Sequence, residues 1–423
     1  MMERRVFLFL QGVCSPFFAR LADRLVADGH QVLKVNFNVG DWMYWAPRPA
    51  VSFRQPLSML SAFLGDLYAR YGVTDQILFG DCRPVHRPAV EKARGLGIRT
   101  HVFEEGYFRP FWVTLEREGV NSYSRLPRDP DWYRALGPTL PEYGRGKSFV
   151  LPFRVRAGHD VAYHLAGALN PLLFPNYRTH HPDNAALQYL GYMHRLPMLR
   201  LHAPRDTNRI YDLIQRGKPF YVLPLQMNGD AQIRDHSRFR DMEEVMWFVM
   251  DSFAPRAPGD AHLVIKNHPL DYGLVPHART AAHLSRHFGL QGRVHYLETG
   301  NLRHLLQRAH GTVTVNSTVG SVALGHVCPT ICLASPIYDL PGLTFQGELD
   351  DFWRERQEPD MKLFRYFRSA VIHTTQVNGG FYSRAGIEQL VENCLPRLLA
   401  EQSVLETLLP ATQADTVGSV IHG

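Results

Sequence analysis

The chain has 423 residues, of which 45% are apolar and 20% are charged, so it can form two or three domains with full hydrophobic cores. This composition excludes a disordered or collagen-like protein. The 46 Lys and Arg residues exceed the 40 Asp and Glu residues by six, and no long basic run is present. Only six of the basic residues are lysines, so arginine, which suits carboxylate and phosphate contacts, is abundant, although codon bias is the simpler explanation. The charge balance favours a local anionic ligand over a nucleic-acid partner.

Cysteine usage and the longest apolar segments limit the cellular compartments in which the protein is expected. Five scattered cysteines without a CxxC pair indicate a reducing compartment and neither a disulfide framework nor a zinc site. The apolar stretch at residues 6–10 is too short for the core of a signal peptide. The longest uncharged segment, residues 161–177, contains two prolines and is not typical of a spanning helix. We therefore expect a cytoplasmic protein or one that lies on a membrane surface.

The first part of the chain alternates between apolar runs typical of buried strands and segments with helical periodicity. Strands are predicted at residues 6–10, 31–37, 76–79 and 99–103, and helices at residues 16–28 and 88–95. Ser15 is the expected N-cap of the first helix, with Pro16 as its first residue. Alternating strands and helices predict a parallel sheet, whose ligands bind at the carboxyl ends of the strands. Ligand-binding residues are therefore expected in the loops after Leu10, Phe79 and Phe103.

A second alternating block follows a stretch rich in arginine, aromatic residues and proline, in which one helix is predicted at residues 184–196. Further strands are predicted at residues 220–225, 262–266, 293–297, 312–315 and 330–333, and helices at 242–253, 279–288, 301–309, after Ser317, and at 385–399. We predict an α/β fold with two Rossmann-like domains that face each other across a cleft. The predicted segments are an N-terminal domain (1–135), a helical connector or insertion (136–205), a C-terminal domain (206–380), and a helix and tail (381–423).

Small hydroxyl residues follow one strand of the second block where a helix begins. In the run Asn316, Ser317, Thr318, the free backbone N–H groups of the helix, its positive dipole end and two hydroxyls are typical of a phosphate cradle. An ordinary N-cap at Ser317 or Thr318 explains the same residues equally well.

Lys266, His268 and Pro269 follow another strand of the same predicted sheet. Lys266 and His268 can both neutralise a phosphate, and Pro269 fixes the direction of the chain. A lone histidine in a loop usually lies on the surface without a functional role. Because the hydroxyl cradle belongs to the same sheet, we interpret the two motifs as parts of one phosphate site.

Two adjacent carboxylates, Glu104 and Glu105, end a strand of the first block. A carboxylate at this position can act as a nucleophile or a base, and Gly106 lets a substrate approach the backbone. A solvated acidic turn paired with Arg109 is the alternative interpretation.

Further polar residues follow the other strands of the first block. Asp81 and Arg83 follow the strand at residues 76–79, and a helix cap is the competing explanation for Asp81. A polar rim is completed by Gln11 and Gly12 after the first strand and by Asn36, Asn38 and Asp41 after the second.

Three patterns are rejected. His283 and His287 have a metal-ligand spacing but lack the glutamate of HExxH and a third ligand. Asp129 and Asp131 resemble the DxD of metal-dependent glycosyltransferases but lie in a proline-rich stretch. No GxGxxG and no GxxxxGK[ST] occurs, so neither a dinucleotide enzyme nor a P-loop ATPase is indicated, and we predict no metal and no cofactor.

Seven runs of residues resemble, in the same order, the bacterial capsule polysaccharide β-Kdo transferases of the KpsS/LipB type. They are FLQGVCSPFFARLADRL, NFNVGDW, FGDCRPVHRPAV, FEEGYFRPFWVTLEREGVN, PLQMNGDAQIRDHS, KNHPLDYG and NSTVGSVALGHVCPTICL. The resemblance extends from near residue 6 to about residue 382 and is weakest near residues 135–200.

The resemblance implies a GT-B glycosyltransferase that transfers 3-deoxy-D-manno-octulosonic acid (Kdo) from CMP-β-Kdo, with retention, to a phosphatidylglycerol-type lipid. This transfer begins the poly-Kdo linker of a capsular polysaccharide. By the same similarity, Lys266 and His268 hold the phosphate of the departing CMP, with Ser317 and Thr318 on its other oxygens. Because CMP leaves as a phosphate monoester, charge stabilisation replaces protonation and no metal is required.

Retention implies a covalent sugar–enzyme intermediate or front-face attack on an ion pair. The resemblance assigns the nucleophile to Glu105, with Glu104 as the alternative. KpsC-type relatives have Glu-Asp-Gly where this chain has Glu-Glu-Gly, so a longer side chain delivers the carboxylate here. Asp81 is the expected base, and Arg83 or Arg109 is expected to meet the Kdo carboxylate.

The remaining predicted site residues surround the donor and the acceptor. On the donor side they are Gln226, Asn228 and Asp230, which shape the pocket, Pro269 and Asn316, and Glu298, which contacts the ribose. On the acceptor or sugar-carboxylate side they are Gln11, Gly12, Arg83 and Asn38.

The implied partners are CMP-Kdo, phosphatidylglycerol or lysophosphatidylglycerol, the inner face of the cytoplasmic membrane, a KpsC-type transferase and the capsule export machinery, and no nucleic acid. The stretch from Trp132 to Arg200 is either the surface that docks on the membrane or the core of the connector. Its candidate docking aromatics are Phe153, Phe174, Tyr177, Tyr189 and Tyr192.

Two rival functions stay open. A CDP-glycerol-type glycerophosphotransferase also has a GT-B fold with histidines near a cytidine diphosphate, but it needs no carboxylate nucleophile. A non-catalytic scaffold of the capsule export complex is the third alternative, and the combination of carboxylates with a phosphate cradle favours an enzyme over it.

Overall fold

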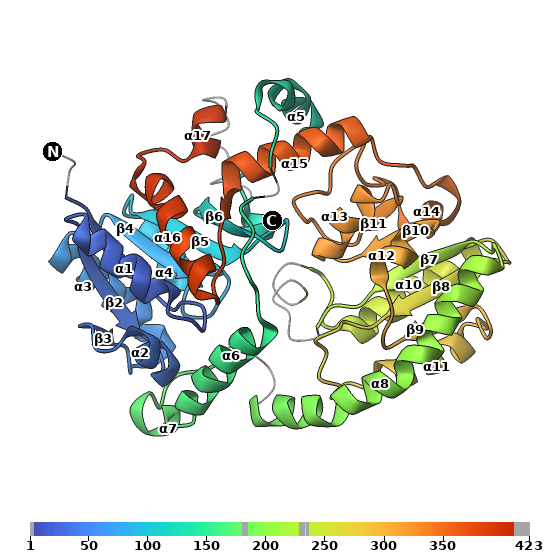
Figure 1. Ribbon diagram of the computed structural model, residues 1–423, viewed down its shortest axis with the longest axis horizontal. Helices are drawn as coiled ribbons and strands as arrows, with labels where there is room; N and C mark the ends of the chain where they lie inside the picture. The colour runs from blue at the N-terminus through green and yellow to red at the C-terminus, as the bar shows by residue number, and fades with distance from the viewer. Residues whose placement is uncertain (1–3, 145, 180–184, 228–232, 234–236, 410–423) are drawn as a thin grey trace. The chain divides into compact units, whose positions relative to one another are not determined.

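The computed structural model describes residues 4–144, 146–179, 185–227, 233 and 237–409. The chain forms two compact units, coloured by residue number in Figure 1. Unit 1 comprises residues 1–126, 140–180 and 369–423, and unit 2 comprises residues 127–139 and 181–368. These units differ from the four predicted segments. The predicted connector is divided between both units, and the C-terminal helix and tail belong to unit 1.

Unit 1 contains a seven-stranded sheet of order β12-β6-β5-β4-β1-β2-β3. Its strands are β1 (Val6–Phe9), β2 (Gln31–Asn36), β3 (Val51–Ser52), β4 (Asp75–Phe79), β5 (Arg99–Glu105), β6 (Trp112–Arg117) and β12 (Gln376–Asn378). Its helices are α1 (Phe17–Ala27), α2 (Val39–Trp45), α3 (Leu60–Tyr71), α4 (Arg87–Arg94), α6 (Phe153–Gly167), α7 (Asn170–Leu173), α16 (Arg384–Leu399) and α17 (Val404–Leu408). Strands β3, β2, β1, β4 and β5 are parallel, as predicted.

The alternating side chains of β1 divide the interior of unit 1 into two cores. Phe7 and Phe9 pack in a cluster with the apolar faces of α1 and α16, whereas Leu8 pairs with α3 and α4 on the other face. Helix α16 lies beside α1 in Figure 1, which explains why the C-terminal segment joins this unit. Helix α1 begins one residue later than predicted, at Phe17, because Pro16 itself occupies the N-cap position.

Two strands of unit 1 depart from the predicted parallel sheet. Strand β6 pairs antiparallel with β5, and β12 pairs antiparallel with β6. The connection between β5 and β6 is too short for a crossover helix, so only a hairpin can form. Gly106 begins this turn, where a Cβ would lie 2.0 Å from the carbonyl oxygen of Trp112, so no other residue fits.

Unit 2 contains a five-stranded parallel sheet of order β11-β10-β7-β8-β9. Its strands are β7 (Phe220–Pro224), β8 (His262–Lys266), β9 (Val294–Leu297), β10 (Gly311–Thr314) and β11 (Thr330–Cys332). Its helices are α5 (Pro130–Leu136), α8 (Ala185–Gln215), α10 (Met242–Arg256), α11 (His277–His287), α12 (Leu302–Leu306), α13 (Thr318–Gly325) and α14 (Leu349–Glu355), and α15 (Met361–Thr375) crosses the unit boundary. The α/β class and a second sheet of its own for the second block are confirmed.

Helix α8 is much longer than the helix predicted at residues 184–196, because it continues through Pro197 and Pro204 to Gln215. Its C-terminal part packs Ile210 and Leu213 against the core on one face of the sheet. This apolar packing stabilises the helix despite the backbone hydrogen bonds that proline cannot form. Across the described part of the chain, no helix is both long and apolar enough to cross a bilayer.

A buried charge cluster lies at the amino ends of the strands of unit 1, opposite the predicted ligand loops. The carboxylate of Asp75 accepts hydrogen bonds from Arg5 Nε at 2.8 Å, Arg99 Nε at 3.1 Å and His101 Nε2 at 2.8 Å. Burial alone would raise the pKa of Asp75, but the bonds from His101 and Arg5 hold it well below its usual range. The cluster therefore stabilises the fold at neutral pH, and its contribution falls as acid protonates the carboxylate.

We predict that Asp75→Asn lowers the free energy of unfolding by about 3–5 kcal/mol, because it leaves buried cations without a counter-charge. Chemical denaturation at pH 7 measures the change. Asp23→Asn is the matched control, since Asp23 pairs with Arg48 at the surface and its side chain is 48% exposed. The control should change stability by less than about 1 kcal/mol. Equal effects of the two substitutions would contradict this account of the cluster.

Candidate functional site

The residues predicted to bind the donor follow four adjacent strands of unit 2. In the sheet order β10-β7-β8-β9, Asn316, Gln226, His268 and Glu298 come soon after the carboxyl ends of successive strands. The chain reverses its direction of progress between β7 and β10, which is the point where open parallel sheets bind ligands. The topology therefore brings these predicted residues to one edge of one sheet.

Gln226 and Asn316 bind each other across the switch point. Gln226 Nε2 donates to Asn316 Oδ1 at 3.1 Å, and the backbone N–H of Asn316 donates to Gln226 Oε1 at 3.4 Å. Both side chains are buried. The pair fixes the loop after β7 against the start of the segment that leads into α13.

Helix α13 begins at this edge. Ser317 is its N-cap, and Ser317 Oγ accepts a hydrogen bond from the backbone N–H of Val319 at 3.2 Å. The ordinary N-cap interpretation of Ser317 is therefore confirmed, whereas Thr318 is the exposed first residue of the helix. Gly320 has to be glycine, because a Cβ would lie 2.2 Å from the hydroxyl of Tyr338. The remaining first-turn N–H groups of α13 keep the positive end of the helix dipole at the strand ends.

The loop after β8 carries the Lys-Asn-His-Pro motif. His268 is half-buried, and its Nδ1 accepts a hydrogen bond from the backbone N–H of Leu270 at 3.1 Å. An accepting Nδ1 leaves the ring proton of the neutral imidazole on Nε2, so His268 presents a donor there. Pro269 follows at the surface as the second residue of a turn, which the hydrogen bond from the backbone N–H of Asp271 to the carbonyl oxygen of His268 closes at 3.1 Å.

Lys266 lies beneath this loop and is almost fully buried. Its ammonium donates to the carbonyl oxygens of Asn267 at 2.9 Å and Glu298 at 3.4 Å. Burial, together with the nearby charge of Arg195, lowers the pKa of Lys266 to about 8. Lys266 therefore joins the loops after β8 and β9, and its positive charge adds to the potential at this edge.

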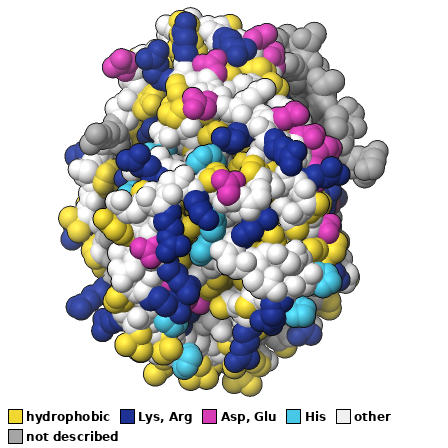
Figure 2. Space-filling model, turned by 90° about the vertical axis from the view of Figure 1, so that its right-hand side faces the viewer, with side chains coloured by type: hydrophobic (Ala, Val, Ile, Leu, Met, Phe, Trp, Pro, Cys, Tyr) yellow, Lys and Arg dark blue, Asp and Glu magenta, His cyan; other side chains and the backbone are white. Residues whose placement is uncertain are grey.

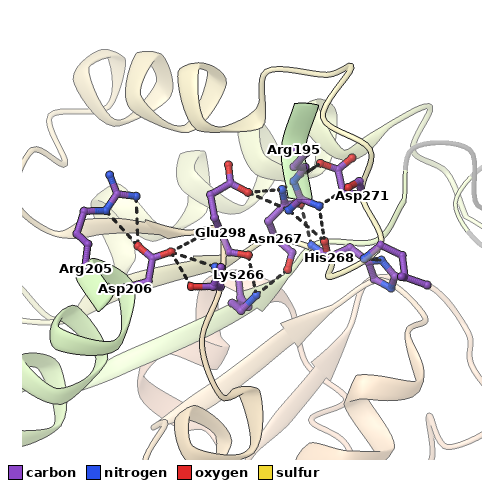
Figure 3. A network of polar contacts seen from close by, with 10 residues as sticks. Arg195, Arg205, Asp206, Lys266, Asn267, His268, Asp271 and Glu298 are labelled. Carbon is purple, nitrogen blue, oxygen red and sulfur yellow. Dashed lines mark hydrogen bonds and ion pairs between the residues drawn. The ribbon is translucent and has the colours of Figure 1, made fainter. Parts of the chain in front are cut away.

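Arg195 of α8 is the centre of a polar network around these two loops, shown in Figure 3. Its guanidinium donates to Glu298 Oε2 at 2.9 Å, to the carbonyl oxygen of His268 at 3.4 Å and to that of Asp271. Asn267 Nδ2 donates to the same Glu298 oxygen at 3.0 Å and to Asp271 Oδ2 at 3.1 Å. Burial opposes ionisation of Glu298, but the bonds from Asn267 and Arg195 lower its pKa overall. Glu298, predicted to contact a ribose, is thus engaged in holding the His268 loop.

Asp206, which follows Arg195 further along α8, holds the loop after β9. The fully buried carboxylate accepts from the backbone N–H groups of Glu298 at 2.9 Å and Thr299 at 3.0 Å (Figure 3). Sequence reasoning missed both Arg195 and Asp206, because α8 lies outside the strand-end loops. A buried Arg and Asp eleven residues apart on one helix leave no distinctive local pattern.

The two predicted carboxylates of unit 1 lie in different environments at the end of β5. Neighbouring strand residues point to opposite faces, so Glu104 lies beside Gly80 whereas Glu105 lies toward α6. Glu105 Oε1 is 3.4 Å from Nη2 of Arg156, which sequence reasoning missed. Glu104 Oε1 accepts the backbone N–H of Glu105 at 2.9 Å. Burial, together with the charge of Glu105, raises the pKa of Glu104 to about 7.

The loop after β4 is held by its own polar side chains. Asp81 is buried, and its Oδ2 accepts the backbone N–H of Val120 at 3.0 Å, so it fastens the loop after β6. Arg83 Nη1 donates to the carbonyl oxygen of Gly12 at 3.1 Å and so joins the loops after β4 and β1. Arg109 is exposed on the β5–β6 turn, where its Nε donates to Gly106 O at 3.4 Å.

Helix α6 supplies the partner of the predicted acceptor-side amides. The hydroxyl of Tyr163 accepts from Gln11 Nε2 at 3.0 Å and from Asn38 Nδ2 at 2.8 Å. Gln11 also donates to the hydroxyl of Tyr177 at 3.1 Å. Asn38 is the N-cap of α2, where its Oδ1 accepts the N–H of Asp41. Gln11 and Asn38 are brought together as expected, but by tyrosines of the predicted connector.

Some predicted residues are placed elsewhere or lie outside the described residues. Asn228 and Asp230 are outside them. Asp129 is the N-cap of α5, where its side chain accepts the N–H of Asp131. In the described ranges, no three His, Cys, Asp or Glu side chains form a group that could hold a metal ion.

The molecule is therefore an α/β protein with polar side chains gathered at the switch point of its all-parallel sheet and a carboxylate pair at the end of β5. Comparison with known proteins identifies its family. A model of the capsule polysaccharide biosynthesis protein family matches residues 74–382, and the chain belongs to that family.

Named relatives agree with this membership. The chain is 37% identical to the capsule polysaccharide export protein KpsS of Escherichia coli, over 90% of this chain and 98% of that protein. It is 36% identical to the capsule polysaccharide modification protein LipB of Neisseria meningitidis serogroup B, over 89% and 91%. The resemblance to the KpsS/LipB type is thus confirmed. A solved structure titled Thermosulfurimonas dismutans KpsC, beta Kdo 2,7 transferase aligns over 92% of this chain and 99% of its own, with 15% identity and a TM-score of 0.43.

We predict that Arg195→Ala lowers the free energy of unfolding by about 3–5 kcal/mol, because it leaves the carboxylates of Glu298 and Asp271 buried without their cation. Chemical denaturation measures the loss. Arg200→Ala, an exposed arginine of the same helix, is the control and should change stability by about 0.5 kcal/mol or less. The network has no structural role of this kind if the two variants are equally stable.

Proposed function

We propose that the protein is a retaining β-Kdo glycosyltransferase that transfers Kdo from CMP-β-Kdo to a phosphatidylglycerol-type lipid, and so begins the poly-Kdo linker of a capsular polysaccharide. Membership of the capsule polysaccharide biosynthesis family supports the pathway. The observation that carries the reaction type is the pair of adjacent carboxylates at the end of β5, one paired with arginine and one with a pKa near neutrality. Two carboxylates in unlike environments are typical of acid–base and nucleophile pairs in glycosyl transfer.

The donor end uses the edge of the unit 2 sheet. The Nε2–H of His268 and the first-turn N–H groups of α13 donate to the phosphate of CMP, and the charge of Lys266 stabilises the dianion as it leaves. Gln226 and Asn316 shape the floor of this site. Arg195 and Asp206 hold its loops, so Glu298 acts by positioning the His268 loop. The proposed chemistry uses these side chains and no metal.

Glu105 is the proposed nucleophile. Its carboxylate attacks the anomeric carbon of Kdo as the bond to the CMP phosphate breaks, and the resulting ester is then displaced by the hydroxyl of the lipid acceptor. Two inversions give overall retention. Arg156 keeps the carboxylate paired and oriented before the donor arrives. Arg83 and Arg109 remain the candidates that meet the Kdo carboxylate.

Glu104 is a better candidate than Asp81 for the base that accepts the proton of the acceptor hydroxyl. A pKa of about 7 suits proton transfer at neutral pH, because an appreciable part of the group is deprotonated and the proton is held well once accepted. Asp81 holds the loop after β6 through the backbone N–H of Val120, whereas the bond that Glu104 accepts comes from its own neighbour Glu105 and holds no other loop. Gln11, Gly12 and Asn38 form the proposed acceptor side.

We predict that Glu105→Gln abolishes transfer while leaving the fold intact, since the amide is isosteric but not nucleophilic. Purified protein, CMP-Kdo made in situ and a short-chain phosphatidylglycerol are incubated, and mass spectrometry detects a lipid heavier by one Kdo. Glu91→Gln is the control, because Glu91 lies on the surface of α4 with its side chain 68% exposed. Full activity in Glu105→Gln would contradict the nucleophile assignment.

The same assay separates the rival functions. If an oligo-Kdo lipid is extended while phosphatidylglycerol is inert, the enzyme has the role of a KpsC-type transferase. A glycerophosphotransferase would be stabilised against heat by CDP more than by CMP. A scaffold would show no change in melting temperature with either nucleotide, and no loss of capsule in cells that carry Glu105→Gln or His268→Ala.

We predict that kcat/KM rises with pH through about 7 in the wild-type enzyme, because Glu104 must be deprotonated to act as a base. Initial rates across this range test the assignment. Glu104→Gln should lower the rate most at the alkaline end and remove the rise, whereas Asp81→Asn should leave the midpoint unchanged. An unchanged midpoint in Glu104→Gln would show that another group titrates.

A further inference from the structure

Helix α6 has two faces of opposite character. Arg156, His159 and Tyr163, at spacings of three and four residues, lie on the face that contacts Glu105, Tyr44 and the amides of Gln11 and Asn38. Val161 and Leu165 stand two residues to either side of Tyr163, roughly 200° around the helix, and so point away from this face. Their exposed fractions are 40% and 70%.

The exposed apolar surface extends beyond α6 in both directions. Leu169, the residue before α7, and Leu172, within α7, are 49% and 80% exposed. Phe153, at the start of α6, is 69% exposed. Soluble proteins rarely expose a cluster of large apolar side chains, and such clusters mark interaction surfaces. We call Phe153, Val161, Leu165, Leu169 and Leu172 the unit 1 stripe.

Helix α8 of unit 2 has the same division. Arg195 faces inward to the network around Glu298, while Leu190, Met193 and Leu201 are 61%, 72% and 70% exposed. Met193 is two residues from Arg195, and Leu190 and Leu201 follow the same outer face at helical spacing. Figure 2, which looks onto unit 2, shows hydrophobic side chains at the lower edge, where α8 lies in Figure 1, with Lys and Arg close by. We call Leu190, Met193 and Leu201 the unit 2 stripe.

Basic side chains flank both stripes. Arg154, next to Phe153, is exposed beside the unit 1 stripe, and Arg200, next to Leu201, is exposed beside the unit 2 stripe. Aliphatic side chains bordered by arginine are typical of helices that lie in the interface of an anionic bilayer, where each basic residue near the surface contributes about 1 kcal/mol. A protein partner would not require this bordering charge.

The aromatic residues expected to dock on a membrane are mostly used inside the protein. Phe174 is buried beneath the guanidinium of Arg54, Tyr177 binds Gln11, and the hydroxyl of Tyr192 donates to Leu270 O at 2.8 Å. Among them Phe153 is the one with a largely exposed ring. The exposed docking candidates are therefore chiefly aliphatic.

We propose that the unit 1 and unit 2 stripes dock on the surface of a bilayer that contains anionic lipid. The proposal deepens the proposed function, on which its biological purpose rests, because a lipid acceptor has to reach the polar loops from a membrane. The inner faces of the same helices hold those loops through Tyr163 and Arg195. In each unit by itself, the docked helix then lies between the bilayer and the loops that it holds, which are the acceptor-side amides for α6 and the donor-side loops for α8.

Sedimentation with phosphatidylcholine vesicles, with and without phosphatidylglycerol, tests the docking without any donor or transfer reaction. The full chain should bind the vesicles that contain phosphatidylglycerol. Combined Leu165→Asp and Leu172→Asp, or combined Leu190→Asp and Met193→Asp, should weaken partitioning by about tenfold or more. The matched control is combined Val26→Asp and Leu96→Asp, which adds the same charge at unit 1 positions that are 56% and 54% exposed. Melting temperatures verify that every variant is folded.

Several outcomes would overturn the docking proposal. The first is failure of the wild-type chain to bind anionic vesicles, and the second is an equal loss of vesicle binding in the control variant. The third is a wild-type dimer, detected by light scattering, that becomes monomeric in the stripe variants while their vesicle binding is unchanged. Transfer to a short-chain, water-soluble phosphatidylglycerol distinguishes this failure from failure of the proposed function. Stripe variants should retain that activity, and its absence in every variant would contradict the transferase proposal but leave the vesicle result standing.

Discussion

Parallel strands place all of their carboxyl ends at one edge of a sheet, and the chemistry of this protein depends on that constraint. In unit 2 the order β10-β7-β8-β9 collects Asn316, Gln226, His268 and Glu298, which are scattered over ninety residues of sequence, into adjacent loops. In unit 1 the ends of β1, β4 and β5 carry Gln11, Asp81 and Glu105 in the same way. The opposite ends of the unit 1 strands carry the Asp75 cluster, so the charges that stabilise this sheet are separated from those proposed to react.

The strand ends alone do not define a site, because loops must also be held in position. Helices α6 and α8, which flank the border between the two units in sequence, provide this support. Tyr163 fixes two amides in unit 1, and Arg195 with Asp206 fixes two loops in unit 2. Arg195 and Asp206 are buried and Tyr163 is half-buried, and α6 and α8 each also carry exposed aliphatic side chains. The segment predicted to be a separate connector thus contributes a loop-holding helix to each unit.

The positions of strands and caps were predicted from the sequence more accurately than the pairing and packing of distant elements. The strand at residues 262–266 is found as predicted, and Ser317 and the apolar runs gave correct positions for an N-cap and for most strands, because these signals are local. Strand β12 was missed because its partner β6 lies far away in sequence, and β6 was missed because its short hairpin with β5 departs from the alternation of strands and helices on which the prediction rested. Helix α8 was predicted too short because its prolines oppose helix formation locally, whereas packing of Ile210 and Leu213 stabilises it.

The candidate site shows the same division. Topology sufficed to bring the motif residues of each unit to one edge, so the positions of Glu104, Glu105, His268 and Asn316 at or just after strand ends were predicted from the sequence. Arg156, Tyr163, Arg195 and Asp206 were not, because their roles depend on where two long helices pack. Their discovery changes the interpretation of Glu298, and the contact of Asp81 with Val120 similarly favours Glu104 as the base.

A crystal structure of the full chain with CMP tests the central claim most directly, because it locates the phosphate. The account predicts that the phosphate accepts hydrogen bonds from His268 Nε2 and from the first-turn N–H groups of α13, above the Gln226–Asn316 pair. A phosphate bound away from the carboxyl ends of β7, β8 and β10 would contradict the account.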